Sequence, residues 1–176
     1  MPNIRFEAAM YKTGDWNIIR LPKEESAKLP SRGLALAEGT INGCQFKTVL
    51  EPDGKGSHWF NVADALLKAA GLVVGKPAVI ELGPSKAWPE PGIPEDIRQA
   101  INNNPQAQNL WTEITPMARW DWLRWIRSTK NPETRAHRID IACDKLNNGE
   151  RRPCCFNRNI CTVTEVSKNG ALIGPE

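Results

Sequence analysis

Five cationic side chains gather around one turn of the sequence, where two helix-like segments meet: Arg124, Arg127, Lys130, Arg135 and Arg138. Arginine forks bind phosphate and carboxylate groups bidentately, so this group predicts a binding surface for an anionic ligand, a nucleic acid or a protein. Trp120 lies nearby and has a ring that can stack on a base. The alternative is that the cations form weak surface ion pairs with acidic neighbours: Asp121, Glu133, Asp140 and Asp144.

A catalytic function would need a general base, and the chain offers two histidines, His58 and His137, besides its carboxylates. His58 follows Gly56-Ser57 at the start of an expected strand. A lone histidine of this kind is more often a hydrogen-bonded structural residue. The sequence contains no G-x-S-x-G elbow, P-loop, H-E-x-x-H helix or dinucleotide-binding glycine pattern. A non-enzymatic protein is therefore favoured, and the alternative is an enzyme with His58 in a cleft between a β-barrel and a helical domain.

Three cysteines near the C-terminus form the other candidate site. Cys154, Cys155 and Cys161, with His58 or His137, would supply the four ligands of a tetrahedral zinc ion. Their spacing differs from the paired C-x2-C pattern of structural zinc sites, and incidental or redox-sensitive thiols are the competing interpretation. The sequence therefore predicts neither a metal nor a cofactor, with zinc binding as an alternative.

The composition is that of an ordinary soluble globular protein. Of the 176 residues, 40% are hydrophobic and 24% are charged, and the net charge of +3 is too small to indicate nucleic-acid binding by itself. No segment approaches the roughly 18 uncharged apolar residues of a membrane span, and the first residues lack the apolar core of a signal peptide. Five cysteines cannot form a complete disulfide framework. We expect a cytoplasmic protein, and the sequence does not indicate its oligomeric state.

The elements that must position these residues fall into two parts, of which the first spans 1–83. Apolar and polar residues alternate at 4–10, which predicts a strand, and further strands are expected at 16–19, 33–41, 44–50 and 78–82, with short helices at 24–29 and 63–70. Asn42-Gly43 predicts a tight hairpin turn. Asn61 or Asp64 is expected to cap the second helix, which Gly71 ends. The expected fold class is α+β, in which 1–83 form a small β-barrel and a helical domain follows.

The second part begins after a Pro/Gly linker at 84–93. Helices are expected at 95–102, at 117–128 and from Pro132 to a stop at Gly149, with one further turn at 107–111, and together they make a helical domain at 94–150. Thr115 and Asn131, each followed by proline, are expected to cap their helices. The tail at 151–176 is expected to form a hairpin in which 159–166 pairs with 171–173.

The helical part also carries the pattern of a known bacterial family. Its most specific segment runs through Trp125-Ile126, Lys130-Asn131-Pro132-Glu133-Thr134-Arg135 and Arg138-Ile139. This part resembles the bacteriocin-protection (YdeI or OmpD-associated) domain. Residues 1–83 resemble a small β-domain of unknown function that is often fused in front of it, through Leu21-Pro22, Pro52-Asp53-Gly54-Lys55-Gly56 and His58. The resemblance implies a double-split β-barrel and a link to tolerance of bacteriocins or cationic antimicrobial peptides, and it brings no reaction, cofactor or active site with it.

Overall fold

The protein divides into two compact units. The computed structural model describes residues 4–154 and 156–175. The first unit combines the described residues of Met1–Ala87, Arg158–Cys161 and Glu165–Glu176, and the second those of Trp88–Asn157 and Thr162–Thr164. Segments of the C-terminal tail therefore belong to both units. Among the described helices, none has the length and apolar character needed to cross a membrane.

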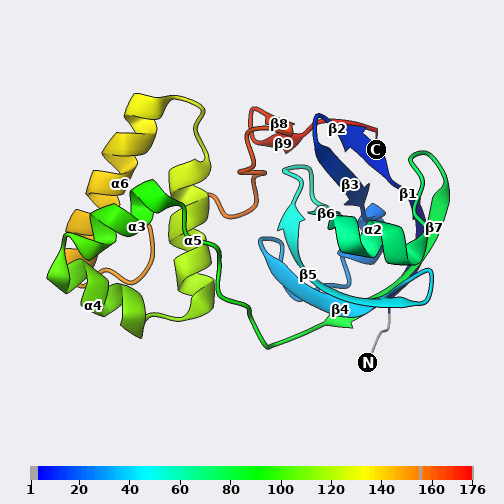
Figure 1. The fold of residues 1–176 in the computed structure, drawn as a ribbon, viewed down its shortest axis with the longest axis horizontal. Coiled ribbons are helices and arrows are strands. Elements are labelled where there is room, and N and C mark those ends of the chain that lie inside the picture. Colours follow the sequence, from blue (N-terminus) through cyan, green and yellow to red (C-terminus); the bar gives the residue numbers. More distant parts are fainter. Residues whose placement is uncertain (1–3, 155, 176) are drawn as a thin grey trace. The chain divides into compact units, whose positions relative to one another are not determined.

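An antiparallel sheet forms the first unit, and within the described residues it has seven strands in the order β1-β7-β4-β5-β6-β3-β2. These are β1 (Ile4–Ala9), β2 (Tyr11–Thr13), β3 (Trp16–Arg20), β4 (Ala35–Ile41), β5 (Cys44–Pro52), β6 (His58–Asn61) and β7 (Pro77–Pro84). β1 and β2 lie at opposite ends of this order although only Met10 separates them in sequence, so the sheet curls into a half-barrel (Figure 1). Short helices α1 (Lys23–Ser26) and α2 (Asp64–Ala70) complete the unit. The predicted α+β class with an N-terminal barrel-type domain is confirmed.

The hairpin predicted at Asn42-Gly43 is also confirmed. Both residues have positive φ angles, 47° and 82°, which asparagine and glycine adopt at the lowest cost. Ile41 pairs with Cys44 across the turn, and this pairing sets the register of β4 and β5. The strands then direct alternate apolar side chains into one core, which includes Phe6, Ile19, Leu50, Phe60, Ile80 and Leu82.

Helix α2 begins without the predicted side-chain cap. Its N-cap position is Ala63, and no side chain accepts a hydrogen bond there. Asn61 instead accepts a hydrogen bond from the backbone N–H of Asn17 at 3.0 Å, beside the pairing of β3 with β6. The predicted cap is therefore wrong, because a contact between strands uses the Asn61 side chain. Gly71 ends the helix as predicted, with a φ of 63°.

The second unit is helical and contains α3 (Glu95–Asn102), α4 (Pro105–Glu113), α5 (Pro116–Arg127) and α6 (Pro132–Asn147). The predicted caps are confirmed: the Thr115 hydroxyl accepts from the N–H of Ala118 at 3.1 Å, and the Asn131 side chain caps α6 in the same way. The single turn expected at 107–111 is wrong, because Pro105 occupies the first position of a complete nine-residue helix.

The core of the second unit lies where α5 and α6 meet the other two helices. Trp122 is fully buried on α5, and its ring meets the half-buried ring of Trp125 edge to face at a centroid distance of 6.2 Å. The buried residues of α6 recur at helical spacing, and they are Ile139, Ala142, Cys143 and Leu146. This apolar spacing marks the buried face of the helix.

The tail hairpin forms at a different place from the one expected. β8 (Ser167–Lys168) pairs with β9 (Ala171–Leu172). Asn169 and Gly170 make the turn between them with positive φ angles of 54° and 78°. The strand predicted at 159–166 is wrong, because the Asn-Gly pair makes a two-residue loop here, as it does between β4 and β5.

Candidate functional site

The predicted cations lie where α5 ends and α6 begins, and we call residues 124–138 the α5–α6 corner. Arg124 and Arg127 occupy the last turn of α5, where cations interact favourably with the carbonyl end of a helix. Asn131-Pro132 then starts α6 after a short loop. The end of α5 and the start of α6, both predicted from the sequence, therefore place these cations at one corner. Tertiary contacts decide which groups each cation faces.

Arg124 lies inside the unit instead of at its surface. Its side chain is 0% exposed, and its guanidinium carbon lies 5.3 Å from the centroid of the Phe156 ring. Phe156 belongs to the chain segment that follows α6. This position differs from the exposed one that the sequence analysis assumed, because the length of chain after α6 covers this face of α5. Arg124 therefore stabilises the fold through a cation–π contact.

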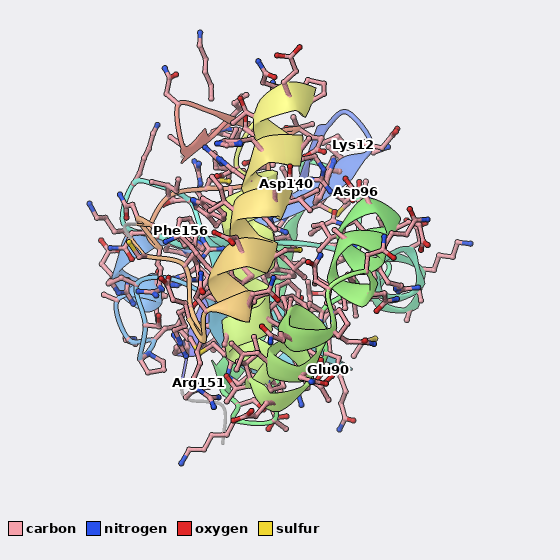
Figure 2. The ribbon with its side chains drawn as sticks, turned by 90° about the vertical axis from the view of Figure 1, so that its left-hand side faces the viewer. Lys12, Glu90, Asp96, Asp140, Arg151 and Phe156 are labelled. Carbon is pink, nitrogen blue, oxygen red and sulfur yellow. The ribbon has the colours of Figure 1, made fainter. Side chains whose placement is uncertain are left out.

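Arg135 forms a two-point ion pair with a carboxylate that the sequence analysis did not consider. Its Nε and Nη2 atoms donate to the two carboxylate oxygens of Asp96 at 2.9 and 3.0 Å. Asp96 lies on α3 and Phe156 on the segment after α6, and Figure 2 labels both. The hydrogen bond from Arg135 lowers the pKa of Asp96 below its ordinary value of 3.8. Arg135 therefore joins α6 to α3.

Arg138 is held in place by neutral groups. Its Nη1 atom donates to the carbonyl of Trp125 at 2.8 Å and to the hydroxyl of Ser128 at 2.6 Å, and the guanidinium lies 5.6 Å from the Trp125 ring centroid. Its Nε and Nη2 atoms make no hydrogen bond to the described residues. No carboxylate is among these partners, so the side chain is fixed while its positive charge is not neutralised.

The remaining predicted site residues, which include Trp120 outside the corner, have mixed surroundings. Lys130 is exposed and makes no hydrogen bond or ion pair with the described residues. Arg127 is half-buried and donates from Nε to the Thr162 hydroxyl at 3.0 Å. Trp120 is half-buried, and its indole N–H donates to the carbonyl of Pro89 at 3.1 Å. Lys130 and Arg138 therefore make no ion pair with a carboxylate of the described residues.

Each of the two units contains a match to the model of a known protein family. The model of the family described as bacteriocin-protection, YdeI or OmpD-associated (OmdA) matches residues 90–149. The model of a domain of unknown function, DUF1905, matches residues 6–82. The chain carries a DUF1905 domain followed by an OmdA domain. Both matches confirm the resemblance seen in the sequence, and a search of curated proteins finds no match to the chain.

The OmdA domain contains a buried cation that the sequence analysis did not select. Arg119 donates from Nε and Nη2 to the two carboxylate oxygens of Glu90. Its Nη1 atom donates to the carbonyls of Trp111 and Ile114, both at 2.7 Å, at the end of α4. The last carbonyls of a helix lack partners within the helix, so Arg119 caps α4 from the side. The sequence gives only a weak signal for this role. Glu90 lies 29 residues before Arg119, whereas Trp111 and Ile114 lie 8 and 5 residues before it, so the three partners follow no single spacing.

In the DUF1905 domain, His58 joins three chain segments. Its ring is 0% exposed, with Nε2 at 2.8 Å from the carbonyl of Gly33 and Nδ1 at 2.6 Å from the hydroxyl of Ser26. A carbonyl can only accept, so Nε2 carries the proton and Nδ1 accepts from Ser26. Burial lowers the pKa of His58 below its ordinary value of 6.5. These contacts match the structural interpretation of this histidine and leave no ring nitrogen available as a base.

The described residues contain no group of three or more histidine, cysteine, aspartate or glutamate side chains that could hold a metal ion. Of the cysteines proposed as zinc ligands, Cys154 is exposed and Cys161 is buried. Cys155 lies outside the described residues. His58 makes the two hydrogen bonds given above, and His137 is exposed on α6. The described part of the chain therefore offers no support for the zinc alternative.

Proposed function

We propose that this protein is a non-enzymatic binding protein whose α5–α6 corner contacts an anionic partner. Lys130 and Arg138 make the primary contacts, and Arg127 and Trp120, both on α5, add further contacts. Arg124 and Arg135 take a structural role in this proposal, since one is buried and the other is paired with Asp96. The candidate partners remain an anionic ligand, a nucleic acid or a protein.

The observation that carries this proposal is the fixed charge of Arg138. Two neutral acceptors hold its Nη1 atom, while Nε and Nη2 make no hydrogen bond to the described residues. A guanidinium fixed in this way loses little side-chain entropy when it binds phosphate or carboxylate. Lys130, which is exposed, adds a second cation at the corner.

A salt series tests this proposal directly. We expect the protein to bind short DNA or RNA at low salt, with affinity that falls as salt rises, because phosphate contacts release counterions. The variant Lys130→Gln should weaken binding and reduce the salt slope by about one unit. Arg138→Lys, which retains the charge but loses the fork, should weaken binding less than Arg138→Gln.

The matched control is Arg98→Gln, which removes an exposed cation from α3 of the same domain. It should leave binding unchanged. An affinity-capture experiment with the same variants covers protein and small-ligand partners. The proposal fails if no partner binds at low salt, or if Arg98→Gln weakens binding as much as Lys130→Gln.

The matched family's description gives the cellular test. We propose that the protein supports tolerance of bacteriocins from the cytoplasm. A strain lacking the gene should lose survival under bacteriocin exposure, and the Lys130→Gln variant should restore less survival than the wild-type chain at equal abundance. Cell fractionation tests the location. Equal survival with the Lys130→Gln chain and the wild-type chain would show that tolerance does not depend on the α5–α6 corner.

A further inference from the structure

The DUF1905 domain contains a cavity that neither the sequence motifs nor the matched families assign to a function. Its volume is about 320 Å³, at the lower end of the range for small-molecule sites. Its polar walls come from two places in the chain: Arg20 and Lys23 at the end of β3 and the start of α1, and the loop of residues 53–57 between β5 and β6. We call it the basic cavity, because three of its lining residues are cations: Arg20, Lys23 and Lys55.

The single carboxylate in the wall is already used to shape the loop. Asp53 accepts hydrogen bonds at Oδ1 from the backbone N–H groups of Lys55 and Ser57, at 2.8 and 2.9 Å. The φ angles of Gly54 and Gly56 are 80° and 94°, a conformation that glycine adopts readily, so the loop can close tightly around Asp53. The cavity wall therefore has an excess of positive over negative side chains.

Lys23 and Arg20 both lie against the loop of residues 53–57. A Cβ atom placed on Gly56 would lie 3.2 Å from Cε of Lys23, so the lysine side chain passes directly over this glycine. The Arg20 side chain is 9% exposed, and its Nε lies 3.4 Å from Oδ2 of Asp53. That buried Nε has no hydrogen-bond partner among the described residues. It forms an ion pair with Asp53 instead, and Nη1 and Nη2 of Arg20 donate to the carbonyls of Pro175 and Leu172 at 2.8 and 3.1 Å, so the guanidinium is held in the cavity wall.

We propose that the basic cavity binds the phosphate group of a small phosphate monoester. Lysine ammonium groups act as compact charges that suit a phosphate dianion, and the lining cations outnumber the carboxylate by two. Gly56 has no side chain, so Lys23 can lie directly against the loop at this position. This site is separate from the α5–α6 corner and does not depend on the function proposed for that corner.

Calorimetric titration with inorganic phosphate and with phosphoserine tests the proposal on the full-length protein. We expect saturable binding of both, with acetate and glycerol binding at least roughly tenfold more weakly, because each charge-assisted hydrogen bond contributes substantially. Lys23→Gln should weaken phosphate binding roughly tenfold or more, and Lys23→Arg should restore most of the affinity. Lys23 is exposed, so thermal unfolding of Lys23→Gln should match that of the wild-type protein.

Lys68→Gln is the matched control, since it removes an exposed cation from α2 of the same domain. It should bind phosphate as the wild-type protein does. Phosphate titrations that show no saturation would overturn the proposal. Equal weakening by Lys23→Gln and Lys68→Gln would overturn it as well, because it would show attraction to overall charge instead of a site.

Discussion

Individual charged residues in this protein have roles that follow from what surrounds them. Arg119 and Arg124 both lie on α5, yet Arg119 caps the end of α4 and pairs with Glu90, while Arg124 lies buried against Phe156. A buried cation needs such contacts, because removing a charge from water without a partner is costly. A residue type that suggests ligand binding in the sequence can therefore serve the fold.

Protonation of His58 should destabilise the DUF1905 domain. Burial lowers its folded-state pKa below 6.5, so the unfolded chain takes up this proton first as the pH falls. The contribution of His58 to stability is then complete above pH 6.5 and decreases below it, by at most about 1.4 kcal/mol per pH unit. Urea unfolding at a series of pH values measures this dependence.

Two variants separate this effect from other titrations. The variant His58→Gln cannot take up the proton, so its stability should depend less on pH below pH 6.5. The variant His137→Gln changes an exposed residue of α6 and should keep the pH dependence of the wild-type protein. Identical pH dependence in the wild-type protein and His58→Gln would contradict the prediction.

Pairs of elements are held together by a small number of polar contacts between distant segments. The ion pair of Asp96 and Arg135 connects α3 to α6, and the indole of Trp120 connects α5 to the chain before α3. In the DUF1905 domain, the N–H of Leu172 in β9 donates to the carbonyl of Asp53 at 2.8 Å, and Arg20 donates to the Leu172 carbonyl at 3.1 Å. The tail hairpin is therefore fixed to the loop that also forms the basic cavity.

The Asp96–Arg135 pair should contribute modestly to the stability of the OmdA domain. The side chain of Asp96 is 51% exposed, so solvent screens the pair, and a double-mutant cycle with Asp96→Asn and Arg135→Gln should give a coupling of about 0.2 to 1 kcal/mol. Because the pKa of Asp96 is lowered, this contribution is present above pH 3.8 and is lost as the pH falls through the folded-state pKa.

Urea unfolding of the two single variants and the double variant measures the coupling. Repeating the cycle in high salt should reduce it, since salt screens exposed charges. A coupling of zero at low salt would show that the pair does not stabilise the folded domain.

At the scale of the whole molecule, the tail links the two units along the chain. Residues 158–161 and 165–175 lie in the first unit, while 162–164 lie in the second. The tail buries Cys161, Val166 and Leu172 in the first unit and Val163 in the second. The family matches end at residue 149, so both matched domains bury apolar residues that lie outside the matches.

Ending the chain at Gly149 should therefore destabilise both domains. Each buried apolar side chain of this size contributes about 1.5 to 3 kcal/mol, so the loss in the first unit should exceed about 3 kcal/mol. Hydrogen exchange resolves the two domains separately, and protection should fall in β3 and β6 as well as in α5. A control chain ending at Ile173 keeps these four residues and should retain most of the protection. Unchanged protection in the chain ending at Gly149 would contradict the prediction.

Local signals in the sequence predicted most of the elements. Asn42-Gly43 predicted its hairpin, and Thr115-Pro116 and Asn131-Pro132 predicted the starts of α5 and α6, because each signal acts within a few residues of backbone. The same signal at Asn169-Gly170 marks the tail hairpin, where the longer strand that we expected from apolar residues did not form. The barrel-type fold came from family resemblance together with the strand pattern.

The sequence by itself determined most of the elements, the two domain types and the position of the cations at one helix junction, since these depend on neighbouring residues and recognisable motifs. Only the tertiary structure decided which cations face outward. Arg135 meets a carboxylate 39 positions away, Arg124 is buried against Phe156, and Arg20 and Lys23 meet the loop of residues 53–57. Charge and hydrogen bonding act through space over a few ångströms, so partners this distant in the chain are fixed only when the chain folds.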